Sequence, residues 1–130
     1  STLTVLRREK SGALSALHTA STLPASATGE SLGGAIALNR AADRLYVSNR
    51  GHESIAVFAV DASGMPTLLQ HIASGGASPR HILLLESEGL LAVAHEEDST
   101  VSIFRIESDG RLAPEPETLT VPGAAFLASA

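Results

Sequence analysis

Apolar and polar residues alternate with a period of two over most of the chain, and clusters of Gly, Asp and Ser interrupt the alternation. Segments such as 55–60 and 101–106 combine this period with Val, Ile and Phe, which favour strands. Turn-forming sequences follow directly at 61–64 and 108–110. The pattern predicts an all-β chain with strands at 3–8, 14–20, 35–39, 44–49, 54–60, 67–73, 81–85, 90–94, 100–106 and 117–121, and the start of a further strand at 124–128.

The alternating pattern also repeats along the chain. Apolar and glycine positions of 35–76 recur 46 positions later in 81–122, with no gap in the alignment. The matching pairs are Ile36 and Ile82, Leu38 and Leu84, Leu45 and Leu91, Val47 and Val93, Ile55 and Val101, Val57 and Ile103, Phe58 and Phe104, Val60 and Ile106, and Gly64 and Gly110. A partial copy precedes them at an offset of 52, as from Leu3 to Ile55. The sequence therefore predicts two four-stranded units, preceded by the two outer strands of another within residues 1–21.

A four-stranded unit that recurs every 40–50 residues is typical of a β-propeller blade. Propellers close a ring of four to eight blades. Residues 1–130 are therefore predicted to be a partial propeller domain, from the C-terminal part of a longer protein. A two-sheet sandwich is the alternative architecture. The unclosed blades predict self-association of the isolated fragment through exposed strand edges.

The direction of the strands predicts which loops lie together. In a sheet of consecutive antiparallel strands, the loop entering the first strand and the loop between the second and third lie at one end. We call this end the rim. The polar residues expected at the rim are Glu30, Arg50, His52, Glu53, Arg80, His81, His95, Glu96, Glu97 and Asp98.

Several rim residues have both a functional and a structural interpretation. Arg50 can bind an anion or hydrogen-bond the carbonyl groups of a neighbouring unit. Arg80, at the start of an inner strand, is expected to reach an anionic ligand. His52 and His95 occupy nearly equivalent turn positions, for which hydrogen bonding within or between units is the favoured interpretation. The acidic run 96–98 is typical of a solvated turn.

Composition narrows the possible partners. The chain has 130 residues, of which 44% are hydrophobic and 18% charged, and its net charge is −5, which argues against a nucleic-acid partner. No apolar run is long enough for a membrane span. The absence of cysteine excludes disulfides and thiolate metal sites and fits a reducing compartment. We expect a cytoplasmic protein with no cofactor and no metal, although a targeting segment upstream would lie outside these residues.

The segment 45–58, Leu-Tyr-Val-Ser-Asn-Arg-Gly-His-Glu-Ser-Ile-Ala-Val-Phe, resembles the "LYVSNRGHDSIAVF" segment of the lactonase seven-bladed propeller family. This family includes a 6-phosphogluconolactonase and relatives of the fungal carboxymuconate cyclase. Supporting matches follow in the family's order at 28–30, 75–80 and 100–106. The family's inner strand usually carries an acidic residue and a His, where this chain has Ala35 and Ala37.

The resemblance implies a sugar-lactone hydrolase of the 6-phosphogluconolactonase type, with a small anionic lactone or sugar acid bound at one mouth of the channel. It implies Arg50 and Arg80 as the cations that bind the substrate. His81 and His95 are further substrate-binding candidates because of their place on the rim. Glu30 and His52 are the nearest acid–base candidates. The fragment itself is expected to be inactive. The alternatives are a non-catalytic propeller that binds a sugar acid or a protein partner, and a carboxymuconate cyclase-like isomerase.

Overall fold

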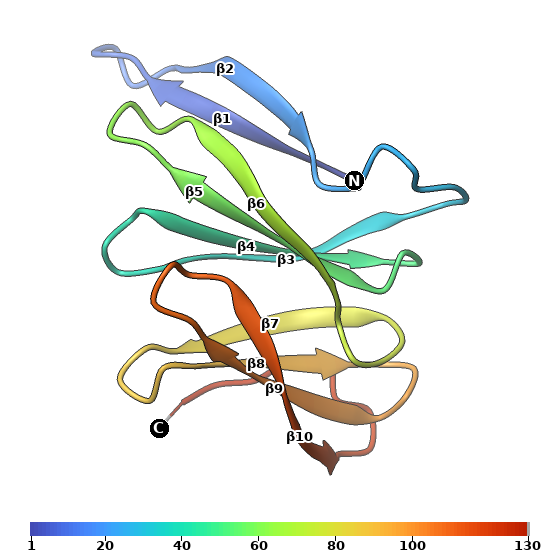
Figure 1. Cartoon of the computed structure of the whole chain (residues 1–130). Helices are drawn as coiled ribbons and strands as arrows, with labels where there is room; N and C mark the ends of the chain where they lie inside the picture. Colours follow the sequence, from blue (N-terminus) through green and yellow to red (C-terminus); the bar gives the residue numbers. More distant parts are fainter. Residues whose placement is uncertain (130) are drawn as a thin grey trace.

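The computed structural model describes residues 1–129 and consists of strands, turns and irregular segments (Figure 1). They form one two-stranded and two four-stranded sheets, in which each strand pairs antiparallel with its neighbour in sequence. The strands are β1 (Thr2–Arg8) and β2 (Leu14–Ser21) in the first sheet, β3 (Leu32–Leu38), β4 (Arg44–Arg50), β5 (Ser54–Val60) and β6 (Pro66–Ala73) in the second, and β7 (Pro79–Leu85), β8 (Leu90–His95), β9 (Thr100–Ile106) and β10 (Leu112–Thr120) in the third.

Within each sheet, short polar turns join consecutive strands, as the sequence predicts. In the β5–β6 turn, the Asp61 side chain accepts hydrogen bonds from the backbone N–H of Ser63 at 2.8 Å and of Met65 at 3.0 Å. Together with a bond from the Ser63 hydroxyl, these hold the pKa of the Asp61 carboxyl below its usual value. Gly64 completes the turn with φ +84°, a conformation that glycine adopts without strain. Such local bonding lets each strand return along its predecessor.

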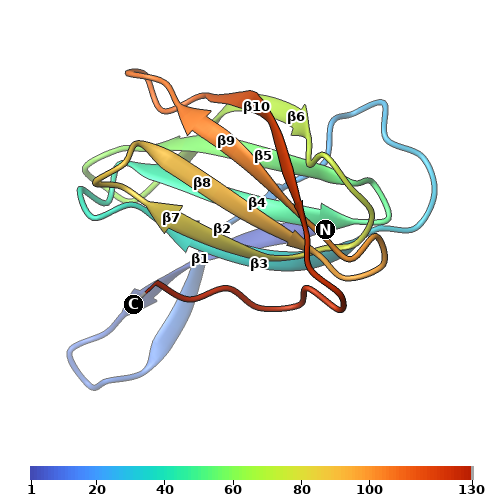
Figure 2. The same cartoon turned by 90° about the horizontal axis from the view of Figure 1, so that it is seen from below.

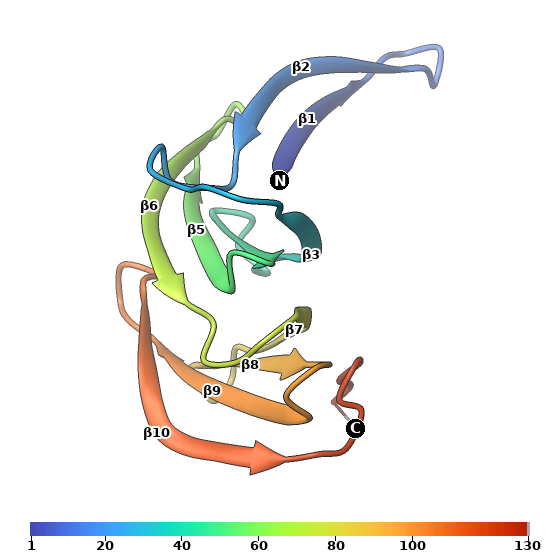
Figure 3. The ribbon, with the colours of Figure 1, turned by 90° about the vertical axis from the view of Figure 1, so that its right-hand side faces the viewer.

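The sheets stand one after another, and not as two layers around one core. The innermost strands of the two four-stranded sheets, β3 and β7, lie side by side, while β6 and β10 lie at the outer edge (Figure 3). Figure 2 shows that the strand order runs in the same sense in both sheets. This arrangement follows the predicted repeat and not the sandwich alternative.

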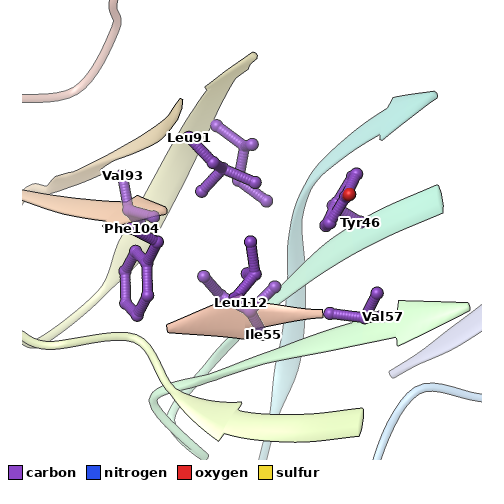
Figure 4. Packing of buried hydrophobic residues seen from close by; sticks show 8 residues of the cluster. Tyr46, Ile55, Val57, Leu91, Val93, Phe104 and Leu112 are labelled. Carbon is purple, nitrogen blue, oxygen red and sulfur yellow. The ribbon is translucent and has the colours of Figure 1, made fainter. Parts of the chain in front are cut away.

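Alternation along the strands gives each sheet two apolar faces. Tyr46, Ile55 and Val57 point toward the third sheet, whereas Val47 and Phe58 point toward the first. The core between the two four-stranded sheets is fully formed (Figure 4). It contains Tyr46, Ile55, Val57, Ile82, Leu91, Val93, Phe104 and Leu112. Each such side chain contributes about 1.5–3 kcal/mol on burial, so this core is the main force that joins the sheets.

Polar side chains fix the two four-stranded sheets relative to each other. The Tyr46 hydroxyl donates to the carbonyl of Gly110 at 3.0 Å, and the Ser48 hydroxyl donates to the carbonyl of Pro79 at 2.8 Å. The Gln70 side chain donates to the Leu112 carbonyl at 3.0 Å and accepts from its N–H at 2.8 Å. Each contact ends on backbone, so the position of one sheet on the next does not depend on a matching side chain.

Two predictions about strands need correction. The last strand begins at Leu112 and not at 117, because Pro114 and Pro116 are tolerated on an edge strand, with a register shift between Pro114 and Thr118. The further strand predicted at 124–128 is wrong, since this segment is irregular. Ala124 and Leu127 instead pack over the free face of the third sheet, against Ala92, Ala94 and Val101.

Candidate functional site

The rim loops of the two four-stranded sheets enclose a pocket of about 610 Å³, which we call the rim pocket. Its walls come from the loop before β3, the β4–β5 turn, the loop before β7 and the β8–β9 turn. The residues that line it are Glu30, Ser31, Leu32, Arg50, Gly51, Glu53, Ser78 and Glu97. Segments distant in sequence therefore meet at the end predicted from strand direction.

Arg50 brings a positive charge to the rim pocket. One terminal nitrogen, Nη2, donates to the carbonyl of Gly33 at 3.1 Å, while the buried Nε has no hydrogen-bond partner. No carboxylate of the described residues forms an ion pair with this guanidinium. An arginine in this state retains donors and charge for an anionic group.

Glycine at position 51 sets how closely the pocket walls approach. Gly51 has φ +86°, and a Cβ there would lie 2.5 Å from the carbonyl oxygen of Glu30. Any other residue would strain the turn and displace the loop before β3. The Arg-Gly pair of the sequence motif therefore places the backbone of Glu30 against the turn that follows Arg50.

Glu53 joins the two sheets across the pocket wall. One carboxylate oxygen accepts from the N–H of Gly51 at 2.7 Å, and the other accepts from the N–H of Ser78 at 2.6 Å. Ser78 directly precedes β7, so Glu53 ties the β4–β5 turn to the loop before the third sheet. Its lone pairs are engaged in structure, and we assign it a positioning role.

The two predicted acid–base candidates lie apart. Glu30 is exposed and lines the rim pocket. His52 lines a different pocket, next to His71 and Ile72 on the outer strand, and its Nδ1 is 2.8 Å from the Ser54 hydroxyl. The structure therefore brings Glu30, but not His52, together with Arg50. A catalytic role for either residue remains a prediction.

Arg80 and His81 are also separate from the rim pocket. Arg80 forms an ion pair with Glu96 at 2.6 Å, with both side chains partly exposed. The His81 ring lies 4.2 Å from the ring of Phe126, and its Nδ1 accepts from the N–H of Leu127 at 3.3 Å. Burial lowers the pKa of His81, which agrees with an acceptor nitrogen. Their substrate-binding roles remain predictions.

His95 is completely buried at the end of β8. Neither ring nitrogen has a hydrogen-bond partner in residues 1–129. Burial is the main cause that lowers the pKa of His95; the nearby backbone groups of Ser74 and Thr100, and then the carboxylates of Asp98 and Glu53, oppose the shift. The ring does not line the rim pocket, so its predicted contact with substrate remains untested.

Positions 35 and 37 do not face the rim pocket either. Ala35 and Ala37 pack against the core between the four-stranded sheets. Within residues 1–129, no group of three or more His, Cys, Asp or Glu side chains is placed to hold a metal ion. The same residues include no helix with the length and apolarity needed to cross a membrane.

The comparison with family models decides the family. The model "Lactonase, 7-bladed beta-propeller" matches residues 1–128. This chain belongs to the lactonase family of seven-bladed β-propellers. The resemblance carried by segment 45–58 and the predicted all-β propeller class are thereby confirmed.

Proteins of known sequence and structure are similar to most of this chain. The 6-phosphogluconolactonase of Bacillus subtilis is 35% identical over 108 residues, which cover 82% of this chain and 31% of that protein. A Lactobacillus plantarum protein of solved structure superimposes with a TM-score of 0.90 and 32% identity, over 96% of this chain and 37% of its own. A Pseudomonas aeruginosa periplasmic gluconolactonase gives a TM-score of 0.90 at 25% identity, over 96% and 35% respectively. The chain thus spans about a third of the length of these relatives.

Sequence analysis did not single out the structural roles of Glu53 and Ser78 in the pocket wall. Both adopt positive φ, +51° for Glu53 and +60° for Ser78. Neither residue type signals such a backbone conformation, so the sequence gives no sign of it. The adjacent Gly51 and the Gly75–Gly76 pair were the available signals that these loops approach each other closely.

Proposed function

We propose that the complete protein containing this chain hydrolyses a small anionic sugar lactone, and that the rim pocket supplies part of the substrate site. The observation that carries the proposal is Arg50, which faces the pocket with a buried Nε that has no partner and with no ion pair among the described residues. The names of the similar proteins, 6-phosphogluconolactonase and gluconolactonase, support this substrate class.

The pocket residues divide the chemistry between charge recognition and proton transfer. Arg50 binds the carboxylate or phosphate of the lactone through charge-assisted hydrogen bonds. Glu30, exposed on the loop before β3, takes a proton from the attacking water. The water oxygen adds to the lactone carbonyl, the ring C–O bond breaks, and the released ring oxygen takes up a proton. The product is the open sugar acid.

The test uses the complete protein with 6-phosphogluconolactone and gluconolactone as substrates. The rate of hydrolysis is measured from the release of protons as each lactone opens to its acid. Arg50→Gln should raise KM roughly 10- to 100-fold, the effect of losing a hydrogen bond to a charged group. Glu30→Gln should lower kcat by about 10²–10⁴. Arg105→Gln is the matched control, because Arg105 pairs with Glu107 and Glu115 on the outer strands and lines no part of the pocket. Unchanged kinetics in both pocket variants would exclude this site.

A non-catalytic sugar-acid-binding protein is the second candidate. It is favoured by the alanines at positions 35 and 37, which pack in the core and provide no acid or base. Wild-type protein that binds 6-phosphogluconate but hydrolyses neither lactone would support it. Loss of that binding in Arg50→Gln would still assign the rim pocket as the binding site.

A further inference from the structure

Asn49 and His95 occupy the same position in the repeat, 46 residues apart, at the ends of β4 and β8. Both side chains are completely buried where one sheet meets the loop that leaves the preceding sheet. Their neighbours correspond as well, because Ser54 matches Thr100 at the same offset, and Thr22 matches Ser74 at the offset of 52. The two junctions are therefore two versions of one structural device.

The first junction is fully hydrogen-bonded. The Asn49 amide nitrogen donates to the Thr22 carbonyl at 2.9 Å and to the Ser54 hydroxyl at 3.2 Å. Its amide oxygen accepts from the Thr22 hydroxyl at 2.6 Å. This network holds the chain after β2 against the end of β4 through the neutral Asn49 amide, and two imidazoles contact its edges, His71 at the Thr22 carbonyl and His52 at the Ser54 hydroxyl.

The second junction lacks these bonds. Both ring nitrogens of His95 and the hydroxyl of Thr100 are buried without partners in residues 1–129, and the Ser74 hydroxyl instead donates to the Gly76 carbonyl at 2.9 Å. The ring lies directly beneath Gly76, where an added Cβ would come within 2.7 Å of its Cγ. Backbone groups of Ser74 and Thr100 lie near the ring without forming a well-aligned hydrogen bond to it, so the imidazole holds its place mainly by fit.

The loop above His95 forms part of the pocket wall. The N–H of Ala77 donates to Asp98 at 2.5 Å, and the N–H of Ser78 donates to Glu53 at 2.6 Å. Ser78 lines the rim pocket. A change in the position of the His95 ring would therefore reach the pocket through the segment 75–78.

We propose that His95 positions the pocket wall in a pH-dependent way. The neutral ring fits beneath the loop 75–78, whereas protonation drives the ring toward water and releases this loop. A buried imidazolium without hydrogen bonds has a high desolvation cost. The charged groups that face the ring are Asp98 on its own turn and Glu53 on the β4–β5 turn. These carboxylates and the nearby backbone groups of Ser74 and Thr100 favour the protonated ring, but burial outweighs them and lowers the pKa of His95.

The sign of the pH effect follows from linkage. The His95 imidazole has an ordinary pKa of about 6.5 when the chain is unfolded or the loop is open. Below this pH, the open state binds a proton on His95 that the closed state does not bind. The closed loop is therefore most stable above that pH. The ratio of closed to open loop falls by up to about tenfold per pH unit as the pH decreases toward the lowered pKa that His95 has in the closed state.

The experiment measures amide hydrogen-exchange protection of Ala77 and Ser78 in the complete protein between about pH 7 and pH 5. Wild-type protection factors should fall severalfold to tenfold per unit below about pH 6.5. In His95→Asn, which installs the residue of the first junction, they should stay constant. His18→Asn is the matched control, because His18 is exposed on β2, and this variant should behave like the wild type.

A second measurement keeps the proposal falsifiable if His95→Asn fails to fold. NMR titration of the wild-type protein should show His95 protonating below the ordinary imidazole pKa of about 6.5. Protection that does not depend on pH in the wild type, an equal fall in His95→Asn, or a His95 pKa at or above about 6.5 would each overturn the proposal. Asn49→His should add a second acid-sensitive step at the first junction.

Discussion

Replacing Tyr46 by Phe should remove one well-defined contribution to stability and to its pH dependence. The side chain is 1% exposed, and its hydroxyl donates to the Gly110 carbonyl at 3.0 Å. Burial is the main cause that raises the pKa of Tyr46 from 10.0 to about 12; Asp43, Glu86 and Asp109 add to the shift, and Arg44 partly offsets it. The variant keeps the ring and loses only the hydroxyl group.

The magnitude follows from two physical terms. At neutral pH, loss of the buried hydrogen bond should cost about 1–2 kcal/mol of unfolding free energy, or roughly 3–6 °C in Tm for a domain of this size. At high pH the free energy of unfolding of the wild type has a second, pH-dependent contribution, because the unfolded state releases the phenolic proton near pH 10 while the folded state retains it. Stability should therefore fall between pH 10 and about 12, by up to about 1.4 kcal/mol per unit.

The assay combines urea unfolding with a spectroscopic titration. The chain contains one Tyr and no Trp, so the near-ultraviolet absorbance of tyrosinate reports Tyr46 alone. Circular dichroism follows unfolding in both proteins, and the variant should lack most of the alkaline loss of stability. Ser15→Ala is a control for hydroxyl removal at an exposed hydrogen bond and should change stability by less than about 0.5 kcal/mol. A Tyr46 that ionises near pH 10 in the folded state would refute the reasoning.

Two further substitutions test the contacts between sheets and the rim geometry. Ser48→Ala should cost about 2 kcal/mol in urea unfolding, because the buried hydroxyl accepts from the Ala35 N–H and donates to the Pro79 carbonyl, each at 2.8 Å. Gly51→Ala should destabilise the fold by more than about 1 kcal/mol, through its φ of +86° and its contact with the loop before β3. Gly12→Ala, with φ +89° and nothing within 4 Å of an added Cβ, measures the backbone strain alone; equal losses in the two glycine variants would show that the close contact is unimportant.

The sequence predicted the strands well, because period-two alternation and the 46-residue repeat act over many positions at once. It failed at the ends of the third sheet. Pro114 and Pro116 gave a misleading signal against a strand, since only the structure shows that β10 is an edge. At 124–128 the apolar residues suggested a strand, but they serve to cover the face of a sheet.

The residues that meet at the rim pocket were predicted only in part, and from strand direction instead of from the alternation and the repeat. Strand direction fixes which loops share an end, so Glu30, Arg50 and Glu97 were correctly expected on one rim. It does not fix where each side chain points, because the backbone angles of the turns decide this. His52 turns toward the outer strand, and His95 lies beneath a loop, as a consequence of local geometry that no residue pattern encodes.

The hydrogen bonds that join the second sheet to the third run from side chains to backbone groups, as at Tyr46, Ser48 and Gln70. Because every residue type offers the same carbonyl group, the receiving sheet can change its sequence without losing the contact. Mutations in one blade therefore need few compensating mutations in the next. Such independence lets a duplicated blade diverge, as the replacement of the Asn49 amide by an imidazole at position 95 illustrates, while the stacking of the blades is preserved.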